Sequence, residues 1–247
     1  MRISIVIPAH NEAEILCPTT EAIVAGLREQ AVPFELLIVE NGSTDESGEL
    51  AEKLAATYDE VEVLRRPEAD YGRALRAGFL AATGDVVVNF DTDFYDLPFL
   101  RAAAALVREP DGPAIVVGTK RGRDSHDGRA WQRRIVTRTF SAVLKIAFGL
   151  HVSDTHGVKA MRRAELVPLV ERCRLGADLF DTELVLRAER VGLVTDELPV
   201  TVVERRPART SIFTRVPRAA LGLLRLRVMF WEESLTAWWR RRGAGRP

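Results

Sequence analysis

Short apolar runs alternate with amphipathic segments over the first hundred residues of the chain. The apolar runs have the length of buried strands, and the segments between them repeat apolar residues at helical spacing. This alternation predicts an α/β fold with a mostly parallel, doubly wound sheet and helices on both faces. The predicted strands are 3–7, 34–39, 61–64 and 86–90, and the predicted helices are 12–30, 47–57 and 71–83.

The pattern is less regular after residue 93. Further helices and strands are predicted, separated by a polar loop at 122–128, and the sequence contains no internal repeat. We expect one domain over residues 1–215, followed by an amphipathic helix over 216–247. The later predicted elements are helices at 98–107, 129–148 and 179–191 and strands at 114–117 and 198–203.

Polar segments follow the first four predicted strands, where a sheet of this kind binds its ligand. In the last of these segments, Asp91 and Asp93 are separated by one residue. Alternate residues of an extended segment point the same way, so both carboxylates can face one ion. Carboxylate oxygens suit Mg²⁺ or Mn²⁺, which would also bind substrate phosphates. A turn with two solvated acids is the alternative explanation.

Composition narrows the classes of function. The chain has 35 basic and 35 acidic residues, so no net charge favours nucleic acid as a partner. Its two cysteines, Cys17 and Cys173, lack metal-binding spacing, which favours a reduced cytoplasmic protein. No signal peptide precedes the first strand, and no apolar stretch reaches the roughly 20 residues of a membrane span. We therefore expect a cytoplasmic protein that is soluble or peripheral at the inner face of the membrane.

Three early segments carry recognisable motifs. Ser4 to Glu12 is a strand ending in P-x-x-N-E, Ile38 to Asp45 is similar to a V-D-D-G-S-x-D segment, and Gly84 leads through a strand into the D-x-D at Asp91. In order and spacing they resemble the family-2 inverting glycosyltransferases. The resemblance implies the GT-A fold, which binds nucleotide-diphospho-sugars, and metal-dependent sugar transfer.

Five later segments extend the resemblance to polyprenyl-phosphate sugar synthases such as dolichol-phosphate mannosyltransferase, without the membrane region that some of them carry. This resemblance implies a polyprenyl phosphate as the sugar acceptor. The sequence departs from the usual family motifs at three places. It has Glu40-Asn41 in place of D-D and Asp70-Tyr71-Gly72-Arg73 in place of G-x-G, and no Gly-Ser-Lys follows Arg206. The five segments are Gly118–Arg121, Arg133–Ser141, Asp154–Lys159, Phe180–Leu184 and Arg205–Ser211.

The resemblance also implies roles for individual residues. Asp93 is expected to contact the metal directly, Asp91 to contact the metal or the ribose, and His156 to be a third metal ligand or an ordinary loop histidine. Glu12 begins a helix, where a carboxylate is favourable without any ligand. The residues expected to bind the nucleotide-sugar donor are Pro8, His10, Asn11, Glu12, Glu40, Asn41, Ser43, Asp70, Arg73, Asp91 and Thr92.

The acceptor decides which catalytic groups are needed. A phosphate monoester is already largely ionised, because its second pKa is about 6, and it needs arginines for positioning. Arg121, Arg134 and Arg206 could form that clamp. An acceptor hydroxyl needs a base, for which Asp154 or Asp181 is the candidate.

Three other functions remain open. One is sugar transfer to the hydroxyl of a soluble metabolite or glycan, and another is a non-catalytic nucleotide-sugar-binding module. A sugar-nucleotide pyrophosphorylase is a third, but the segment Pro8 to Glu12 lacks the Gly-rich loop that those enzymes carry after the first strand.

The predicted C-terminal helix has an apolar stripe with arginines elsewhere around it, and it ends in Trp238-Trp239 and three arginines. Such a helix can lie on an anionic membrane. Alternatively, it packs on its own domain or across the seam of a homodimer. The stripe consists of residues 221, 224, 228, 231, 235 and 238.

Overall fold

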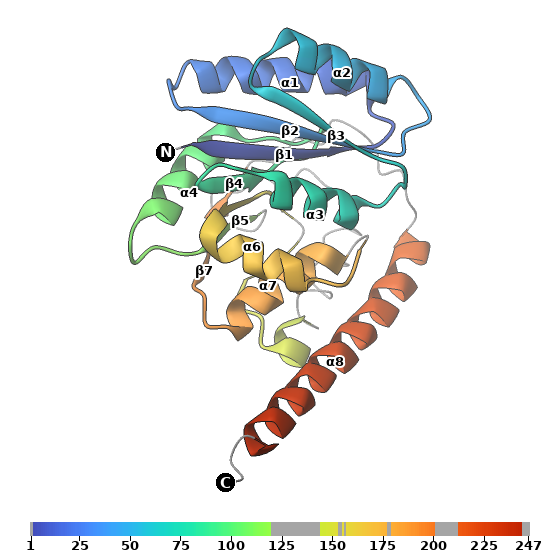
Figure 1. The fold of residues 1–247 in the computed structure, drawn as a ribbon, viewed down its shortest axis with the longest axis vertical. Coiled ribbons are helices and arrows are strands. Elements are labelled where there is room, and N and C mark those ends of the chain that lie inside the picture. The colour runs from blue at the N-terminus through green and yellow to red at the C-terminus, as the bar shows by residue number, and fades with distance from the viewer. Residues whose placement is uncertain are drawn as a thin grey trace. The chain divides into compact units, whose positions relative to one another are not determined.

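A seven-stranded sheet runs through the first part of the chain in this computed structural model (Figure 1), which confirms the predicted α/β fold. The strand order is β3-β2-β1-β4-β6-β5-β7. β1 to β4 are parallel to their neighbours, β5 and β7 are parallel to each other, and β6 is antiparallel to both β4 and β5. The strands are β1 (Ile3–Ala9), β2 (Phe34–Asn41), β3 (Val61–Arg66), β4 (Val86–Asn89), β5 (Ile115–Thr119), β6 (Lys159–Arg162) and β7 (Thr195–Pro199).

The structure describes residues 2–119, 144–152, 155, 157–176, 179–200 and 212–243, with side chains described for 221–236 of the last range. The chain divides into two compact units, Met1–Arg206 and Pro207–Pro247. The boundary predicted from the sequence lies between residues 215 and 216, nine residues further along the chain. No helix in the described ranges is both long enough and apolar enough to cross a membrane.

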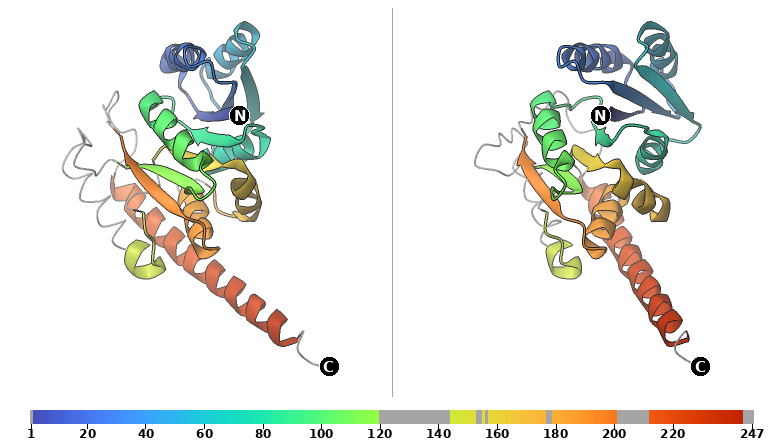
Figure 2. Two further views of the ribbon diagram at one scale, coloured as in Figure 1. Left: turned by 90° about the vertical axis from the view of Figure 1, so that its left-hand side faces the viewer. Right: turned by 60° about the vertical axis from the view of Figure 1, so that its left-hand side comes forward.

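Helices cover both faces of the sheet (Figures 1 and 2). Alternate residues of the central strands, such as Ile5 and Ile7, share one core with α1, α2 and α4. On the other face, a Cβ atom at Gly78 of α3 would lie 2.3 Å from Val6, and Phe79 contacts Phe180 of α7. The helices are α1 (Ala13–Arg28), α2 (Ser47–Thr57), α3 (Tyr71–Ala81), α4 (Leu97–Arg108), α6 (Arg163–Arg172), α7 (Phe180–Arg190) and α8 (Ile212–Gly243).

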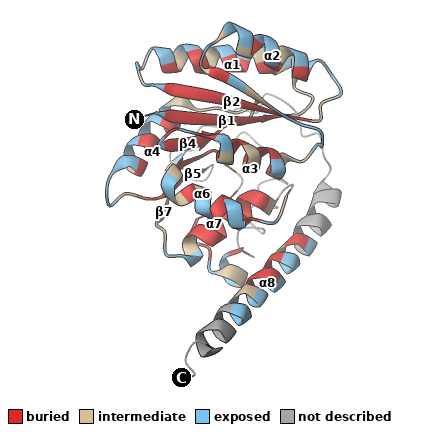
Figure 3. Ribbon diagram, viewed as in Figure 1, coloured by how far each residue is buried: buried red, intermediate tan, exposed pale blue. Residues whose placement is uncertain are grey.

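Burial explains the continuous apolar sequence of the central strands. Every residue of β1 and β2 is buried, because helices cover both faces of these strands (Figure 3). Even the polar residues Ser4 and Glu35 are buried there, and they are hydrogen bonded to each other. The period-two alternation of a half-exposed strand is therefore absent from the sequence.

The structure corrects the sequence analysis in the second half of the chain. It contains a strand, β6, and a helix, α6, that the sequence analysis missed. The strand predicted at 198–203 begins earlier, at Thr195, since it pairs with β5 from Ile115↔Thr195 to Thr119↔Pro199, and its predicted residues 201–203 lie outside the described residues. Of the helix predicted at 129–148, the described part is helical over 144–148.

Candidate functional site

The loops that follow β1 and β2 are hydrogen bonded to each other at the carboxyl edge of the sheet. The Asn11 N–H donates to Ser43 Oγ (3.1 Å), and Asn11 Oδ1 accepts from the Thr44 N–H (2.8 Å). The Glu12 N–H donates to Ser47 Oγ (2.8 Å). Asn11 has a left-handed backbone with φ of 54°, which asparagine tolerates better than most residues. We call these two loops, residues 10–12 and 42–47, the polar shelf.

Glu40 and Asn41, which replace the usual pair of aspartates, bind backbone groups of the polar shelf and of β1. Both are buried. Glu40 Oε1 accepts from the Ser43 N–H (2.6 Å), and Asn41 Nδ2 donates to the Ala9 carbonyl (2.9 Å). His10 Nδ1 lies 2.9 Å from the Asn41 carbonyl oxygen. Because Glu40 and Asn41 already bind protein atoms, their contact with a nucleoside stays a prediction.

The loop after β3 meets the same edge. Gly42 has φ of 66°, and a Cβ atom there would lie 2.9 Å from the Pro67 carbonyl oxygen. Only glycine permits this backbone and this close approach. Asp70 then caps α3, because its Oδ1 accepts from the Arg73 N–H (2.8 Å). Asp70 and Arg73, both predicted to bind the sugar donor, therefore begin a helix beside the shelf.

Asp91, Thr92 and Asp93 form a turn just after β4. The Asp91 N–H donates to the Phe94 carbonyl (3.0 Å), and the Thr92 carbonyl accepts from the hydroxyl of Thr19 in α1 (2.7 Å). Thr92 is buried, Asp91 is half-buried and Asp93 is exposed. The backbone of the turn is thus anchored, and the two carboxylates are at the edge where the sequence predicted them.

Tyr71, at the start of α3, connects this turn to the rest of the site. Its hydroxyl donates to Asp91 Oδ1 at 2.9 Å. Burial, followed by the charges of Asp91, Asp181 and Asp93, raises the pKa of Tyr71 well above its ordinary value. Carboxylates from the turn after β4 and from α7 therefore act on one half-buried phenol, which stays neutral and can donate its proton in a hydrogen bond.

Asp181, one of the two predicted bases, is held in a buried ion pair. Lys159 Nζ donates to Asp181 Oδ1 (2.8 Å) and to the Gly157 carbonyl (2.7 Å). The side chains of Lys159 and Asp181 are 0% and 3% exposed. Oγ1 of Thr182, the residue that follows Asp181, lies 2.9 Å from Thr155 Oγ1. The start of α7 is therefore fixed against the segment that leads into β6.

Glu183, also buried, holds the loop between α6 and α7. It accepts hydrogen bonds from the backbone N–H groups of Arg174 and Leu175 and from Arg187 Nε (2.8 Å). A Cβ atom at Gly176 would lie 2.6 Å from Asp70 Oδ2, so this loop packs on the start of α3. The motif Phe180 to Leu184 thus orients elements around the site.

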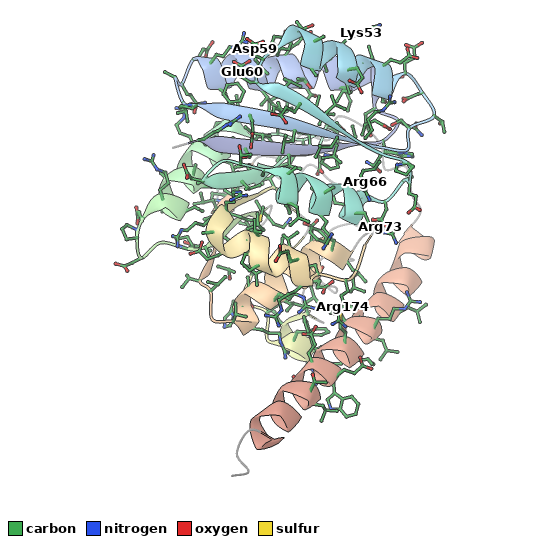
Figure 4. The ribbon with its side chains drawn as sticks, viewed as in Figure 1. Lys53, Asp59, Glu60, Arg66, Arg73 and Arg174 are labelled. Atoms are coloured by element: carbon green, nitrogen blue, oxygen red, sulfur yellow. The ribbon has the colours of Figure 1, made fainter. Side chains whose placement is uncertain are left out.

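Exposed arginines lie around this part of the sheet edge (Figure 4). Arg66 ends β3, Arg73 lies in the first turn of α3, and Arg174 lies in the loop after α6. Arg73 Nη1 is paired with Glu68 (2.6 Å). The guanidinium groups of Arg66 and Arg174 are cations that the sequence analysis did not select. Arg121, Arg134 and Arg206, together with Asp154 and His156, lie outside the described residues.

Both cysteines are free thiols, as the sequence predicted. Cys173 is buried next to Arg174, and burial, followed by the charge of Glu183, raises its pKa to about 12. Such a thiol stays protonated at neutral pH and is a poor nucleophile or metal ligand. The chemistry of the site therefore rests on oxygen and nitrogen groups.

The carboxylates of Asp91 and Asp93 fit a hard divalent ion such as Mg²⁺ or Mn²⁺. Within the described ranges, no group of three or more His, Cys, Asp and Glu side chains could hold a metal. An ion at these two carboxylates would take further ligands from water, from phosphate oxygens of a ligand, or from residues outside the described ranges such as His156. This is the arrangement that Mg²⁺ usually adopts with phosphate substrates.

Comparison with known proteins gives one family and several relatives. Residues 4–168 match the family model described as "Glycosyl transferase family 2". The chain is 30% identical to "Glycosyltransferase AglD" of Haloferax volcanii over 205 residues, which are 81% of this chain and 33% of that protein. It is 28% identical to "Undecaprenyl-phosphate 4-deoxy-4-formamido-L-arabinose transferase" of Proteus mirabilis, covering 70% of this chain and 52% of that protein. The chain thus spans about half or less of these two relatives.

Among solved structures, the fold is similar to glucosyl-3-phosphoglycerate synthase from Mycobacterium tuberculosis in complex with Mn²⁺, UDP and glucosyl-3-phosphoglycerate. The TM-score is 0.65 at 22% identity, covering 91% of this chain and 78% of that one. At this identity the similarity establishes the fold, which is the predicted GT-A fold.

Proposed function

We propose, because this chain belongs to glycosyl transferase family 2, that it transfers a sugar with inversion from a UDP- or GDP-linked donor to a polyprenyl phosphate. The observation that carries the proposal is the position of Asp91 and Asp93. They lie after β4 in a GT-A sheet, and they share its carboxyl edge with the polar shelf and the start of α3. A nucleotide that lies on this edge would place its diphosphate beside the two carboxylates.

Asp93 is the residue that would hold Mg²⁺ or Mn²⁺ directly, since its side chain is exposed. Asp91 would bind the ion or the ribose with the oxygen that does not accept from Tyr71. When bound, the divalent ion neutralises the charge that develops on the leaving nucleoside diphosphate. The polar shelf would then hold the nucleoside through its backbone groups and through His10, Asn11 and Ser43.

The ion pair of Asp181 supports a phosphate acceptor over a hydroxyl acceptor. A general base must be able to reach the acceptor proton, but Asp181 is buried and bonded to Lys159 at 2.8 Å. A phosphate monoester needs no base, because it is largely ionised at neutral pH. Exposed Arg66 and Arg174 add positive charge on this side, beside the arginine clamp of Arg121, Arg134 and Arg206 that remains a prediction. The name of the Proteus mirabilis relative, an undecaprenyl-phosphate transferase, supports the same acceptor.

The test is release of nucleoside diphosphate by the purified protein with Mn²⁺ or Mg²⁺. A panel of UDP-, GDP- and TDP-sugars is offered with and without a short polyprenyl phosphate, and Asp93→Ala is the control. Release that requires the lipid phosphate and is lost in Asp93→Ala supports the proposal. Release with a soluble phosphorylated or hydroxyl acceptor instead would establish the alternative acceptor class. A protein that binds no donor in the presence of metal would contradict enzymatic sugar transfer.

We also propose that α8 brings the enzyme to an anionic membrane surface, where a polyprenyl phosphate would be found. The sequence of α8 has seven arginines and two glutamates, a net charge of +5 (7 − 2). Five apolar residues of one stripe are 38–63% exposed. Two such helices would repel each other, which disfavours a homodimer, whereas anionic lipid attracts arginine and interfacial tryptophan. The five residues are Leu221, Leu224, Val228, Trp231 and Leu235.

Sedimentation with vesicles tests this contact. Leu224→Glu should reduce binding to phosphatidylglycerol vesicles by roughly tenfold, because a charge replaces buried apolar area. Val194→Glu is the matched control, since Val194 and Leu224 are 61% and 62% exposed but lie in different units. Equal binding of both variants would contradict the proposal. A change in solution mass of Leu224→Glu without vesicle binding would indicate a dimer instead.

A further inference from the structure

Tyr71 interacts with acidic residues from both halves of the chain. Its hydroxyl donates to Asp91 Oδ1 at 2.9 Å, and Asp93 and Asp181 lie close enough to act on it electrostatically. Asp181 is in turn bonded to Lys159 at 2.8 Å. The phenol is therefore hydrogen bonded to a carboxylate of the proposed donor site and also feels the charge of Asp181 in the ion pair of α7.

The start of α3, which carries Tyr71, is fixed by a helix cap and by a loop packed on that cap. Asp70 caps the helix that Tyr71 begins, and the loop at Gly176 packs on that cap. Glu183 holds the same loop through the backbone N–H groups of Arg174 and Leu175. The side chain of Tyr71 is half-buried. A hydroxyl on so constrained a ring has little freedom, so its hydrogen bond restricts the rotation of its partner.

The hydrogen bond has a specific consequence for Asp91. The backbone of Asp91 is already fixed by its bonds to Phe94, and the bond from Tyr71 adds a restraint on its side chain. One carboxylate oxygen accepts from Tyr71, which orients the other oxygen. A carboxylate that is oriented before an ion arrives loses less conformational entropy when it binds.

We propose that Tyr71 is a positioning residue whose hydroxyl orients Asp91 for the divalent ion and the donor diphosphate. The inference rests on the proposed function of the Asp91–Asp93 turn. Tyr71 does not itself contact the ion, and it acts through Asp91. The Tyr71 hydroxyl is also an uncharged hydrogen-bond donor near the carboxylates of Asp91, Asp93 and Asp181.

The experiment is a Mn²⁺ titration of the full chain, monitored by electron paramagnetic resonance, with and without nucleoside diphosphate. Tyr71→Phe keeps the ring and removes the hydroxyl, and we expect the dissociation constant for Mn²⁺ to rise by about tenfold. Tyr58→Phe is the matched control, because Tyr58 packs against Arg28 (5.4 Å) in the turn before β3. The thermal unfolding midpoint of each variant shows whether the ring still packs.

A double-mutant cycle separates positioning from a general structural effect. In an Asp91→Ala background, Tyr71→Phe should weaken Mn²⁺ binding by less than about twofold, because no side-chain acceptor for the Tyr71 hydroxyl remains at residue 91. The same tenfold loss in both backgrounds would overturn the inference, as would unchanged Mn²⁺ binding by Tyr71→Phe alone. If the wild-type chain and Asp93→Ala bind Mn²⁺ equally, the proposed metal site itself fails. That outcome is distinct from a failure of the role of Tyr71.

Discussion

The two edges of the sheet use buried polar groups for different purposes. At the amino edge, Glu35 accepts from the Ser4 hydroxyl, from the Thr83 N–H (2.6 Å) and Oγ1 (2.8 Å), and from Arg2 (2.9 Å). At the carboxyl edge, Asp93 is exposed and Asp91 is only half-buried. Glu35 at the amino edge therefore stabilises the fold, as the buried Glu40 and Asn41 do at the carboxyl edge. At the carboxyl edge, Asp91 and Asp93 in addition keep the capacity to bind a ligand.

A surface hollow at the amino edge shows the same contrast. It is lined by six residues, and two of them are arginines, the side chains that an anion site would need. However, Arg2 is paired with Glu35 (2.9 Å) and Arg28 with Glu60 (2.8 Å). A hollow whose cations are already neutralised is a poor binding site, and it lies away from every motif found in the sequence. The lining residues are Arg2, Arg28, Val32, Pro33, Phe34 and Glu60.

The largest expected effect is that of Asp93→Ala on sugar transfer. We expect the rate of sugar transfer to fall by about 10⁴-fold, because a bound metal contributes several kcal/mol to transition-state stabilisation. Since Asp93 is exposed, the free energy of unfolding should change by less than about 0.5 kcal/mol. Transfer assays and denaturant unfolding of the same preparation check both parts. A destabilised Asp93→Ala would mean that this edge also serves the fold.

Lys159→Met should destabilise the protein by about 3–5 kcal/mol, because it leaves Asp181 buried without its cation. The double variant Lys159→Met, Asp181→Leu should recover most of that loss, since no unpaired charge remains. Urea unfolding measures the change. Sugar transfer by the double variant would show that Asp181 is not a base, whereas a stable but inactive double variant would contradict the phosphate-acceptor argument.

Glu35→Gln should cost about 2 kcal/mol at pH 7, because it weakens several bonds to a buried carboxylate. Burial raises the pKa of Glu35, but hydrogen bonds from Ser4 and Thr83 and the charge of Arg2 outweigh it and lower the pKa. The stabilisation is therefore full above the unfolded pKa of about 4.3 and is lost as the pH falls through the lower folded pKa. The difference between wild type and Glu35→Gln in unfolding free energy should shrink over that range. Donor binding at pH 7 should not change.

Asp70→Ala should have the smallest effect on stability, about 1 kcal/mol, through loss of the α3 cap. Asp70→Asn keeps an oxygen that can accept from the Arg73 N–H, so it should cost only a few tenths of a kcal/mol. Thermal unfolding and donor titration of the pair separate the two roles of Asp70. Weaker donor binding in both variants would support the predicted donor contact, and weaker binding in Asp70→Ala alone would assign Asp70 to the helix start.

The sequence predicted the first half of the fold well, because each strand there is a continuous apolar run that ends in polar or glycine residues. The range 47–57 was predicted for α2 and is found unchanged. β6 was missed because it has four residues, two of them Lys159 and Arg162, whose burial depends on partners elsewhere in the chain. The start of β7 was predicted three residues too late because the valines at 200, 202 and 203 are more typical of a strand than Thr195–Glu197, whereas pairing with β5 begins the strand at Thr195.

The same distinction holds for the candidate site. Asp91, Asp93 and the shelf residues stand next to strand ends, so their meeting at one edge follows from the rule for parallel sheets. Tyr71 and Lys159 lie in segments that the sequence analysis compared with family motifs, but nothing in the sequence indicated that Tyr71 would bind Asp91 or that Lys159, the first residue of β6, would pair with Asp181. Glu40 and Asn41 were predicted from their motif position, but the sequence could not indicate that their polar atoms bind the protein.

The sequence by itself determined the fold class, the family and the position of the D-x-D turn, because strand periodicity and motif spacing are local properties of the chain. Only the tertiary structure decided that Tyr71 holds Asp91, that Lys159 neutralises Asp181, and that Glu183 fixes the loop against α3. These contacts join residues 8 to 22 positions apart, or link separate elements through a shared loop. Their energies depend on burial and on distances of about 2.8 Å, which exist only once the sheet and its helices have assembled.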